Sequence, residues 1–191
     1  VGKWVLRTAC EQIRLWNNGT TSLPMSVNLS GSQFRHEFLA EMVENTIKEF
    51  GVDPRQLTLE ITESIFVKDQ DFTIAILKRL KSIGVSLSID DFGTGYSSLS
   101  YLKKFPVDFV KIDQSFVKDV ATDPDATSLV TAIINMAHSL NLKTIAEGVE
   151  TEDQWKILRL LKCDMAQGYY FCTALPPEEA RKRAMLAKQA A

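Results

Sequence analysis

The sequence predicts an α/β fold of the TIM-type (β/α) barrel class, incomplete, with about six of the eight strands of such a barrel. Short apolar strands alternate with helical segments along the chain, and nearly every strand ends in polar or charged residues. The 191 residues are also fewer than the roughly 250 of a full barrel. An open doubly wound sheet is the alternative, but such a sheet gathers its functional residues at one switch point.

A helix with no predicted strand before it opens the chain. Apolar residues recur at helical spacing over residues 4–16. The turn residues at 17–19 then lead into the first predicted strand, at 25–29, and an amphipathic helix follows at 38–50. This order starts the alternation of strand and helix that the fold class requires.

Glycine and proline mark the boundaries of the next unit. Gly51 stands where the C-terminus of a helix favours a left-handed residue, and Pro54 prevents the helix from continuing. A second strand is therefore expected at 57–61. The helix after it, at 72–83, ends at Gly84 for the same reason as the one before.

The third strand, at 85–89, alternates valine, leucine and isoleucine with serine, as expected for a strand inserted in a core. A short helix at 97–105 stops before Pro106, because the residue that precedes a proline disfavours the helical conformation. Residues 107–112 form the fourth strand.

The last third of the chain repeats the pattern. A longer helix is expected at 126–140 and the fifth strand at 143–146. Thr151 and Gln154 have the spacing of a capping box, which predicts the start of another helix. The sixth strand is expected at 165–171.

These elements define one domain. We expect residues 1–176 to form a partial barrel and residues 177–191 to form the C-terminal helix and tail of the same domain. Pro177 suits the first position of that terminal helix, because its missing N–H has no partner there in any case.

Composition limits the classes of function. A hydrophobic content of 45%, a charged content of 24% and a net charge of −2 are typical of one globular domain. The absence of a basic run argues against binding of DNA or RNA polymers. The apolar runs are shorter than the roughly 18 residues of a spanning helix, so no membrane contact is expected. Three scattered cysteines favour reduced thiols and a cytoplasmic location.

The most informative segment is S-I-D-D-F-G-T-G, residues 88–95. The third strand delivers Asp90 and Asp91 to its carboxyl end, which is where barrel enzymes hold their reactive groups. Two adjacent carboxylates repel each other, so fixing both at a strand end requires a compensating cation.

Other strand ends supply further polar residues. In a barrel these ends converge on one face, so residues distant in the sequence become one ring of oxygen ligands with an ammonium group among them. The residues at the other strand ends are Asn28, Glu60, Glu63, Lys111, Asp113, Glu147, Glu150 and Gln167. Oxygen ligands without Cys or His at ligand spacing favour Mg²⁺ or Mn²⁺ over zinc. Paired carboxylates such as Asp90 and Asp91 favour two metal ions, because one carboxylate can bridge both ions while the neighbouring carboxylate binds the second ion.

Seven motifs occur in a fixed order along residues 3–176. They are W-V-L-R-T-A-C, S-V-N-L-S, L-E-I-T-E-S, I-D-D-F-G-T-G-Y-S-S-L, V-K-I-D, A-E-G-V-E and Q-G-Y. Several are short, but D-D-F-G-T-G-Y-S-S-L is highly specific, and so are the order and spacing of the set. Through these motifs the chain resembles the EAL domain, a family of bacterial signalling phosphodiesterases that act on cyclic di-GMP.

The resemblance implies metal-dependent hydrolysis of cyclic di-GMP to linear pGpG, with two Mg²⁺ or Mn²⁺ ions. One ion would be held by Asn28, Glu60 and Asp90, and the other by Asp90, Asp91 and Glu147. A water acidified by both ions would attack one phosphodiester bond. Glu147 has also been cast as a general base in such enzymes, but the acidified water lessens that need, so the metal-ligand role is expected first.

The resemblance also implies roles for the surrounding residues. Lys111 would lie beside the attacking water, where it would orient the hydroxide or neutralise charge on the phosphorane. Glu150 and Gln167 would support the shell of metal and water, and Glu63 would brace the loop after Asp91. Two glycines of that loop and one strand-end carboxylate complete the supporting group: Gly93, Gly95 and Asp113.

One departure from the family pattern bears on activity. The Glu-Ala-Leu motif that names the family, whose glutamate is a further metal ligand, has no counterpart in this sequence, and neither do a neighbouring arginine and two strands. Two alternatives follow: either the parent protein has this part and is an active enzyme, or the chain occurs without it and its activity should fall by orders of magnitude. The resemblance further implies a homodimer, or fused sensory or GGDEF domains, as partners.

Two other functions fit parts of the pattern. The first is a catalytically inactive EAL module that binds cyclic di-GMP as a receptor, although such receptors usually lose metal-binding residues that are present here. The second is a metal-dependent barrel of another class, such as an enolase-type lyase with Lys111 as its base. The order of the motifs disfavours the lyase.

Overall fold

The computed structural model describes residues 2–17, 23–63, 65, 70–95 and 102–189. Within them, six strands form one parallel sheet whose spatial order is also the chain order. The strands are β1 (Met25–Leu29), β2 (Leu57–Thr62), β3 (Ser86–Phe92), β4 (Phe109–Ile112), β5 (Lys143–Ala146) and β6 (Met165–Ala166). The expected α/β class with about six strands is confirmed, and β1 and β6 are the two edges of a sheet that is not closed.

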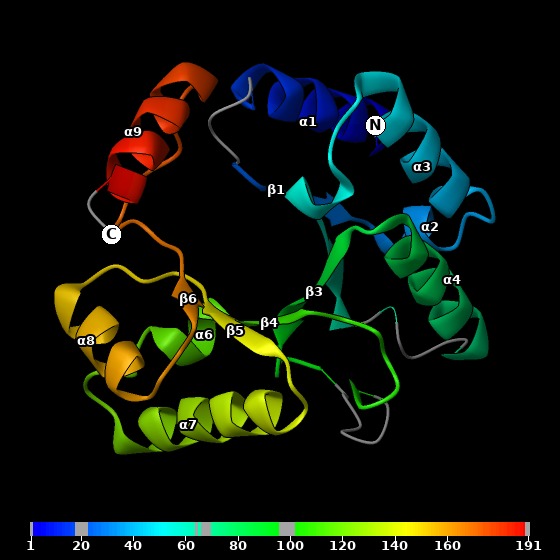
Figure 1. Cartoon of the computed structure of the whole chain (residues 1–191). Coiled ribbons are helices and arrows are strands. Elements are labelled where there is room, and N and C mark those ends of the chain that lie inside the picture. The colour runs from blue at the N-terminus through cyan, green and yellow to red at the C-terminus, as the bar shows by residue number, and fades with distance from the viewer. Residues whose placement is uncertain (1, 18–22, 64, 66–69, 96–101, 190–191) are drawn as a thin grey trace.

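The helices surround the strands, which occupy the middle of the molecule (Figure 1). They are α1 (Gly2–Trp16), α2 (Gly31–Phe34), α3 (Leu39–Phe50), α4 (Gln70–Ile83), α6 (Gln114–Val117), α7 (Pro124–Ser139), α8 (Glu152–Leu160) and α9 (Pro177–Gln189), with a 3-10 turn at η1 (Pro54–Gln56). None of the described helices combines the length and the apolar content needed to cross a membrane.

The core lies between the helices and the outer face of the sheet. Five strand residues of this layer are at most 1% exposed: Leu59, Ile61, Leu87, Ile89 and Val110. Successive strand residues point to opposite faces of the sheet. Glu60, Ser88 and Lys111 are the immediate neighbours of these core residues, so they point to the inner face. The apolar alternation thus buries one face and leaves the other free to carry polar groups.

The predicted helix ends are confirmed where backbone geometry dictated them. Gly51 ends α3 with a left-handed φ of 65°, and Gly84 follows α4 with φ of 101°. Both bonds of the capping box between Thr151 and Gln154 are present at the start of α8. Pro177 is the first residue of α9.

The sixth strand is shorter than expected, so the prediction of a strand over 165–171 is wrong. β6 ends at Ala166. Gly168 lies so close to Val149 that a Cβ on it would be 2.2 Å from the Val149 carbonyl oxygen. The chain turns there, and the Tyr170 N–H donates to that same oxygen at 2.9 Å. A close approach of backbones, rather than strand propensity, decides this segment.

Two further differences concern short helices. The helix expected at 97–105 falls mostly on residues outside the described ones; of its described part, Leu102 is helical and residues 103–105 form a turn and bend. The four-residue helices α2 and α6 are absent from the sequence-based expectation. Each follows directly on a strand and is shorter than the period that an apolar pattern needs to reveal a helix.

Carboxylates tie the amino ends of two strands to their neighbours. Asp108 Oδ2 accepts from the Leu87 N–H at 2.8 Å, and its side chain pairs with Lys81. Asp164 Oδ2 accepts from the Thr144 N–H at 2.8 Å and from the Thr144 hydroxyl at 2.9 Å. This end of a parallel barrel carries stability rather than chemistry.

Replacing Asp164 by alanine should destabilise the fold by about 1–3 kcal/mol, because two donors of the fully buried Thr144 lose their acceptor. Chemical denaturation at pH 7 measures the change. Asp153→Ala on the exposed surface of α8 is the control and should stay within about 0.5 kcal/mol of the unmodified chain. Equal losses from both variants would contradict this role.

The same variant makes a pH test. Burial works to raise the pKa of Asp164, but hydrogen bonds from His138 and Thr144 outweigh it and lower that pKa. A carboxyl whose pKa is lower in the folded state stabilises the fold above its unfolded pKa of about 3.9, and this contribution disappears as the pH falls through the folded value. The stability difference between Asp164→Ala and the unmodified chain should therefore shrink below about pH 4.

Candidate active site

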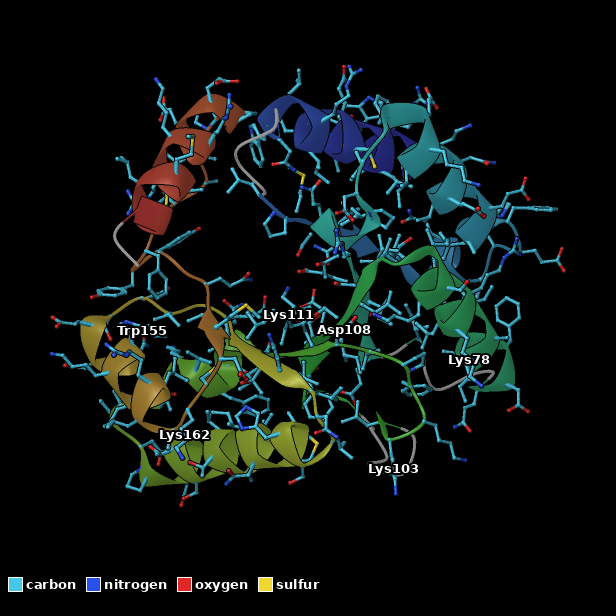
Figure 2. All side chains as sticks on the ribbon, viewed as in Figure 1. Lys78, Lys103, Asp108, Lys111, Trp155 and Lys162 are labelled. Atoms are coloured by element: carbon cyan, nitrogen blue, oxygen red, sulfur yellow. The ribbon has the colours of Figure 1, made fainter. Side chains whose placement is uncertain are left out.

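Lys111 lies at the centre of a cluster of carboxylates. Its Nζ is 2.7 Å from Glu60 Oε2, 2.8 Å from Asp90 Oδ1 and 2.7 Å from Glu147 Oε1. The side chain is 4% exposed and lies among the strands, inside the surrounding helices (Figure 2). An ammonium has three N–H donors, and each one here has a carboxylate acceptor.

Four consecutive strands supply these groups. Glu60 belongs to β2, Asp90 to β3 and Lys111 to β4, while Glu147 directly follows β5. Parallel strands present their carboxyl ends at the same edge of the sheet, so residues up to 87 positions apart in the chain meet at one point. The convergence expected from the sequence is present for these four residues.

A bulge in β3 brings the second aspartate to the same place. Ile89 pairs with Val110 and Phe92 with Ile112, so Asp90 and Asp91 lie opposite the single residue Lys111. Asp91 has φ of 53°, a left-handed conformation that few residues other than glycine adopt. In a regular strand the two carboxylates would point to opposite faces, and the bulge removes that constraint.

Asp90, Asp91 and Glu147 each present a carboxylate oxygen, and these three oxygens lie within 4.8 Å of one another. Together with Glu60, four carboxylates face the one ammonium of Lys111, so the acidic groups outnumber it by three. All the donors are hard oxygen atoms, which fit Mg²⁺ or Mn²⁺. The residues present therefore suit a divalent metal.

Burial and charge shift the pKa values of the cluster. Desolvation disfavours the charged form of Lys111, but its hydrogen bonds to Asp90, Glu147 and Glu60 outweigh that effect and raise its pKa. Burial raises the pKa of Glu147 despite the hydrogen bond from Lys111. The pKa of Asp91 is raised by burial and by the charges of Asp90 and Asp113. The crowding of negative charge is what a bound cation would relieve.

Asn28 and Gln167 lie at the two sides of this cluster. Asn28 is directly opposite Glu60 in the register of β1 and β2, and its side chain is exposed. Gln167 Nε2 donates to Glu147 Oε1 at 2.5 Å, the same carboxylate oxygen that lies 2.7 Å from Lys111 Nζ. Both residues lie where a ring of ligands at the carboxyl ends of the strands would extend.

Glu63 connects the end of β2 to the loop after Asp91. Its Oε2 accepts from the Gly93 N–H at 3.1 Å, and the carboxylate is 5% exposed. Gly95 is beside it, since a Cβ there would lie 3.0 Å from Glu63 Oε1. Gly93 has φ of 99°, and a Cβ there would lie 2.8 Å from the ring of Phe116. The packing of this loop therefore requires glycine at position 93, whereas a side chain at position 95 would need a small shift of the Glu63 carboxylate.

The structure brings two predicted residues less directly to the site. Asp113 is the N-cap of α6, where its Oδ1 accepts from the Ser115 N–H at 2.9 Å, and its charge still acts on Asp91. Glu150 is exposed, and its carboxylate is not among the three described groups that share the candidate metal position. Its backbone N–H, in contrast, donates to Gln154 Oε1 at 2.7 Å.

Comparison with known sequences identifies relatives over nearly the whole chain. The family model of the EAL domain matches residues 1–174. The bifunctional diguanylate cyclase/cyclic di-GMP phosphodiesterase MucR of Pseudomonas aeruginosa is 44% identical over 180 residues, which are 94% of this chain and 26% of that protein. The cyclic di-GMP phosphodiesterase NbdA of the same organism is 44% identical over 174 residues, 91% of this chain and 22% of that protein. The chain spans about a quarter of the length of these relatives.

Solved structures give the same family by shape. The P. aeruginosa MucR phosphodiesterase in complex with c-di-GMP matches with a TM-score of 0.89 and 44% identity, covering 94% of this chain and 73% of that one. The EAL domain of Mycobacterium smegmatis DcpA has a TM-score of 0.91 and 39% identity, covering 98% and 84%. Klebsiella pneumoniae BlrP1 in a manganese and cyclic di-GMP complex matches with a TM-score of 0.81 and 28% identity, covering 90% of this chain and 44% of that one. These matches confirm the predicted barrel class.

Lys111→Met keeps most of the side-chain volume but removes the ammonium. With a chelator present, we expect the variant to be about 3–5 kcal/mol less stable, because the buried carboxylates of Glu60 and Asp90 and the partly buried one of Glu147 lose their partner. Added Mn²⁺ should then raise the melting temperature of the variant more than that of the unmodified chain, since no ammonium repels the ion.

The matched control for this test is Lys78→Met, which removes a charge from the exposed surface of α4 (Figure 2). Thermal unfolding with and without Mn²⁺ compares the three proteins. If Lys111→Met were as stable as Lys78→Met in chelator, the cluster would not depend on the ammonium.

Proposed function

The chain belongs to the EAL domain family, and on that premise we propose that it is a metal-dependent phosphodiesterase that opens cyclic di-GMP to linear pGpG. The proposal is supported above all by the cluster around Lys111, in which acidic groups from β2, β3 and the end of β5 surround the buried ammonium that β4 carries. A site with such an excess of carboxylates suits a divalent metal, and with it a phosphodiester substrate.

We propose that two divalent ions, Mg²⁺ or Mn²⁺, bind at the cluster. Their ligands would be Asn28, Glu60, Asp90, Asp91 and Glu147. When bound, such ions neutralise the phosphodiester and lower the pKa of a coordinated water. The protein's part is to hold five oxygen donors from three strands and one loop close together, so that little reorganisation is needed when the substrate arrives.

Lys111 and its neighbours provide positioning and charge. The ammonium fixes the carboxylates of Glu60, Asp90 and Glu147 relative to one another, and its positive charge would stabilise the negative charge that develops on the phosphoryl oxygens during attack. Gln167 restricts the rotation of the Glu147 carboxylate by its hydrogen bond. Glu147 serves first as a ligand.

Residues of the surrounding loops support the same site. Glu63 holds the loop of Gly93 and Gly95 against the end of β2, which fixes the segment that follows Asp91. Asp113 caps α6 and shapes the field at Asp91. We assign Glu150 to this supporting group as well, through its place on the loop that carries Glu147.

We further propose that residues 1–176 form the EAL portion of one domain and that residues 177–191 are its C-terminal helix and tail. Pro177 and Ala180 of α9 line a cavity together with Trp4 and Val5 of α1, which supports a single packed unit. Relatives that are about four times longer support fusion to further signalling domains, including a GGDEF domain, or a homodimer. Three free cysteines support a cytoplasmic location.

Incubation with cyclic di-GMP and Mg²⁺ or Mn²⁺, followed by chromatography for pGpG, tests the function. Two forms are compared: this chain, and the chain extended at its N-terminus by the Glu-Ala-Leu strand of the family pattern. We expect pGpG at least from the extended form, no product with EDTA, and at least about a hundredfold less product from Asp90→Asn. Asp153→Asn, on the exposed surface of α8, should match the unmodified rate.

Two results would overturn the proposal. Tight binding of cyclic di-GMP with no product from either form would favour the receptor function. Product that persists in EDTA would contradict the metal dependence.

A further inference from the structure

The loop that carries Glu147 is attached to α6, the short helix that follows the strand of Lys111. Gly148 has φ of 66° and lies against Gln114 of α6, so closely that a Cβ on it would be 2.6 Å from the Gln114 Cβ. The Glu147 N–H donates to the Ile112 carbonyl at 3.1 Å. The start of this loop is therefore fixed by the end of β4 and by the first residue of α6.

The other end of the loop is held by one side chain. Gln154 is 6% exposed, and its Oε1 accepts from the N–H groups of Glu150 at 2.7 Å and Thr151 at 2.9 Å. Its Nε2 donates to the carbonyl of Lys118, the C-cap of α6, at 2.9 Å. An amide is needed at this position, because the contacts require both an acceptor and a donor.

These contacts go beyond what a helix cap requires. A capping box needs the bond from Gln154 to Thr151, whereas the bonds to Glu150 and Lys118 join the loop to a different helix. The loop residue Val149 is also paired with the end of β6, through its N–H to the Gln167 carbonyl at 3.0 Å. The four residues after Glu147 thus have fixed partners on both sides.

We propose that Gln154 is a positioning residue for the metal site. It acts through residues 147–151, which it holds against α6, and so keeps the Glu147 carboxylate beside Lys111 and close to Asp90 and Asp91. The proposal rests on the proposed function, because it assumes that these carboxylates bind a divalent metal. Groups that orient metal ligands typically change affinity or activity by about 10–100-fold when removed.

Gln154→Met tests the proposal, because methionine has a similar length and apolar stem but makes none of the three hydrogen bonds. Electron paramagnetic resonance of free Mn²⁺ measures the affinity of the chain without substrate. We expect Mn²⁺ affinity to fall by about 10–100-fold, and the amide hydrogens of residues 150 and 151 to exchange faster. If turnover is present, raising Mn²⁺ to saturation should recover most of the lost kcat.

Thr151→Ala is the matched control. It removes the hydroxyl that accepts from the Gln154 N–H at 3.2 Å and so weakens the start of α8, yet it leaves the three bonds of the Gln154 amide in place. We expect Thr151→Ala to have a lower melting temperature than the unmodified chain. Its Mn²⁺ affinity should stay within about twofold of that of the unmodified chain, well short of the loss of about 10–100-fold expected when a group that orients a metal ligand is removed. Equal loss of affinity in both variants would show that Gln154 serves only the stability of α8, and would overturn the proposal.

A second variant covers the case in which Gln154→Met fails to fold. Gln154→Glu has the same shape and keeps the acceptor but loses the donor to Lys118, so it should also weaken Mn²⁺ binding. Unchanged Mn²⁺ affinity in a folded Gln154→Glu would contradict a role for the link to α6. Mn²⁺ binding is measured without substrate, so the two proposals can fail separately. If the unmodified chain shows no turnover but these variants bind Mn²⁺ more weakly, the proposed function fails and this inference stands.

Discussion

The pairing of one buried ammonium with carboxylates from three other strand ends is the constraint on which the rest of this structure depends. A charge as deeply buried as that of Lys111 is tolerated only with partners, and each of its donors has one. Those partners come from β2, β3 and the end of β5, so the pairing exists only if these strands are parallel, adjacent and in register with β4. The strand order and register that define the fold are therefore the same features that assemble the site.

The two ends of the sheet have different roles, one in stability and the other in binding. At the amino ends, Asp108 and Asp164 accept hydrogen bonds from strand N–H groups, and each carboxylate has a further side-chain partner, Lys81 for Asp108 and the His138 ring for Asp164. At the carboxyl ends, acidic groups exceed the available cations. A surplus of like charge costs stability and is retained where a ligand of opposite charge relieves it. That asymmetry is what separates a binding site from a set of structural ion pairs.

Much of the fold could be predicted because local rules decide it. The period-two alternation that buries Leu87 and Ile89 and the left-handed Gly51 are consequences of a few neighbouring residues. The pair Asp90 and Asp91 was identifiable for a similar reason, since adjacent carboxylates after a buried strand are hard to explain without a cation.

The features that could not be predicted from the sequence depend on contacts between segments that are distant in the chain. The early end of β6 is set by the backbone of Val149, and the shared position of Asp90 and Asp91 is set by a bulge against β4. Gln154 was predicted as a helix cap, but its bond to Lys118 joins residues 36 positions apart. No local pattern encodes such a link.

Anomalous diffraction from crystals of the chain grown with Mn²⁺ would locate a metal at the carboxylate cluster. We expect at least one manganese peak bounded by the carboxylates of Asp90, Asp91 and Glu147, with Lys111 retained beside it. Millimolar Mn²⁺ that leaves this position without a peak would contradict the claim that the excess of carboxylates exists to hold a divalent metal.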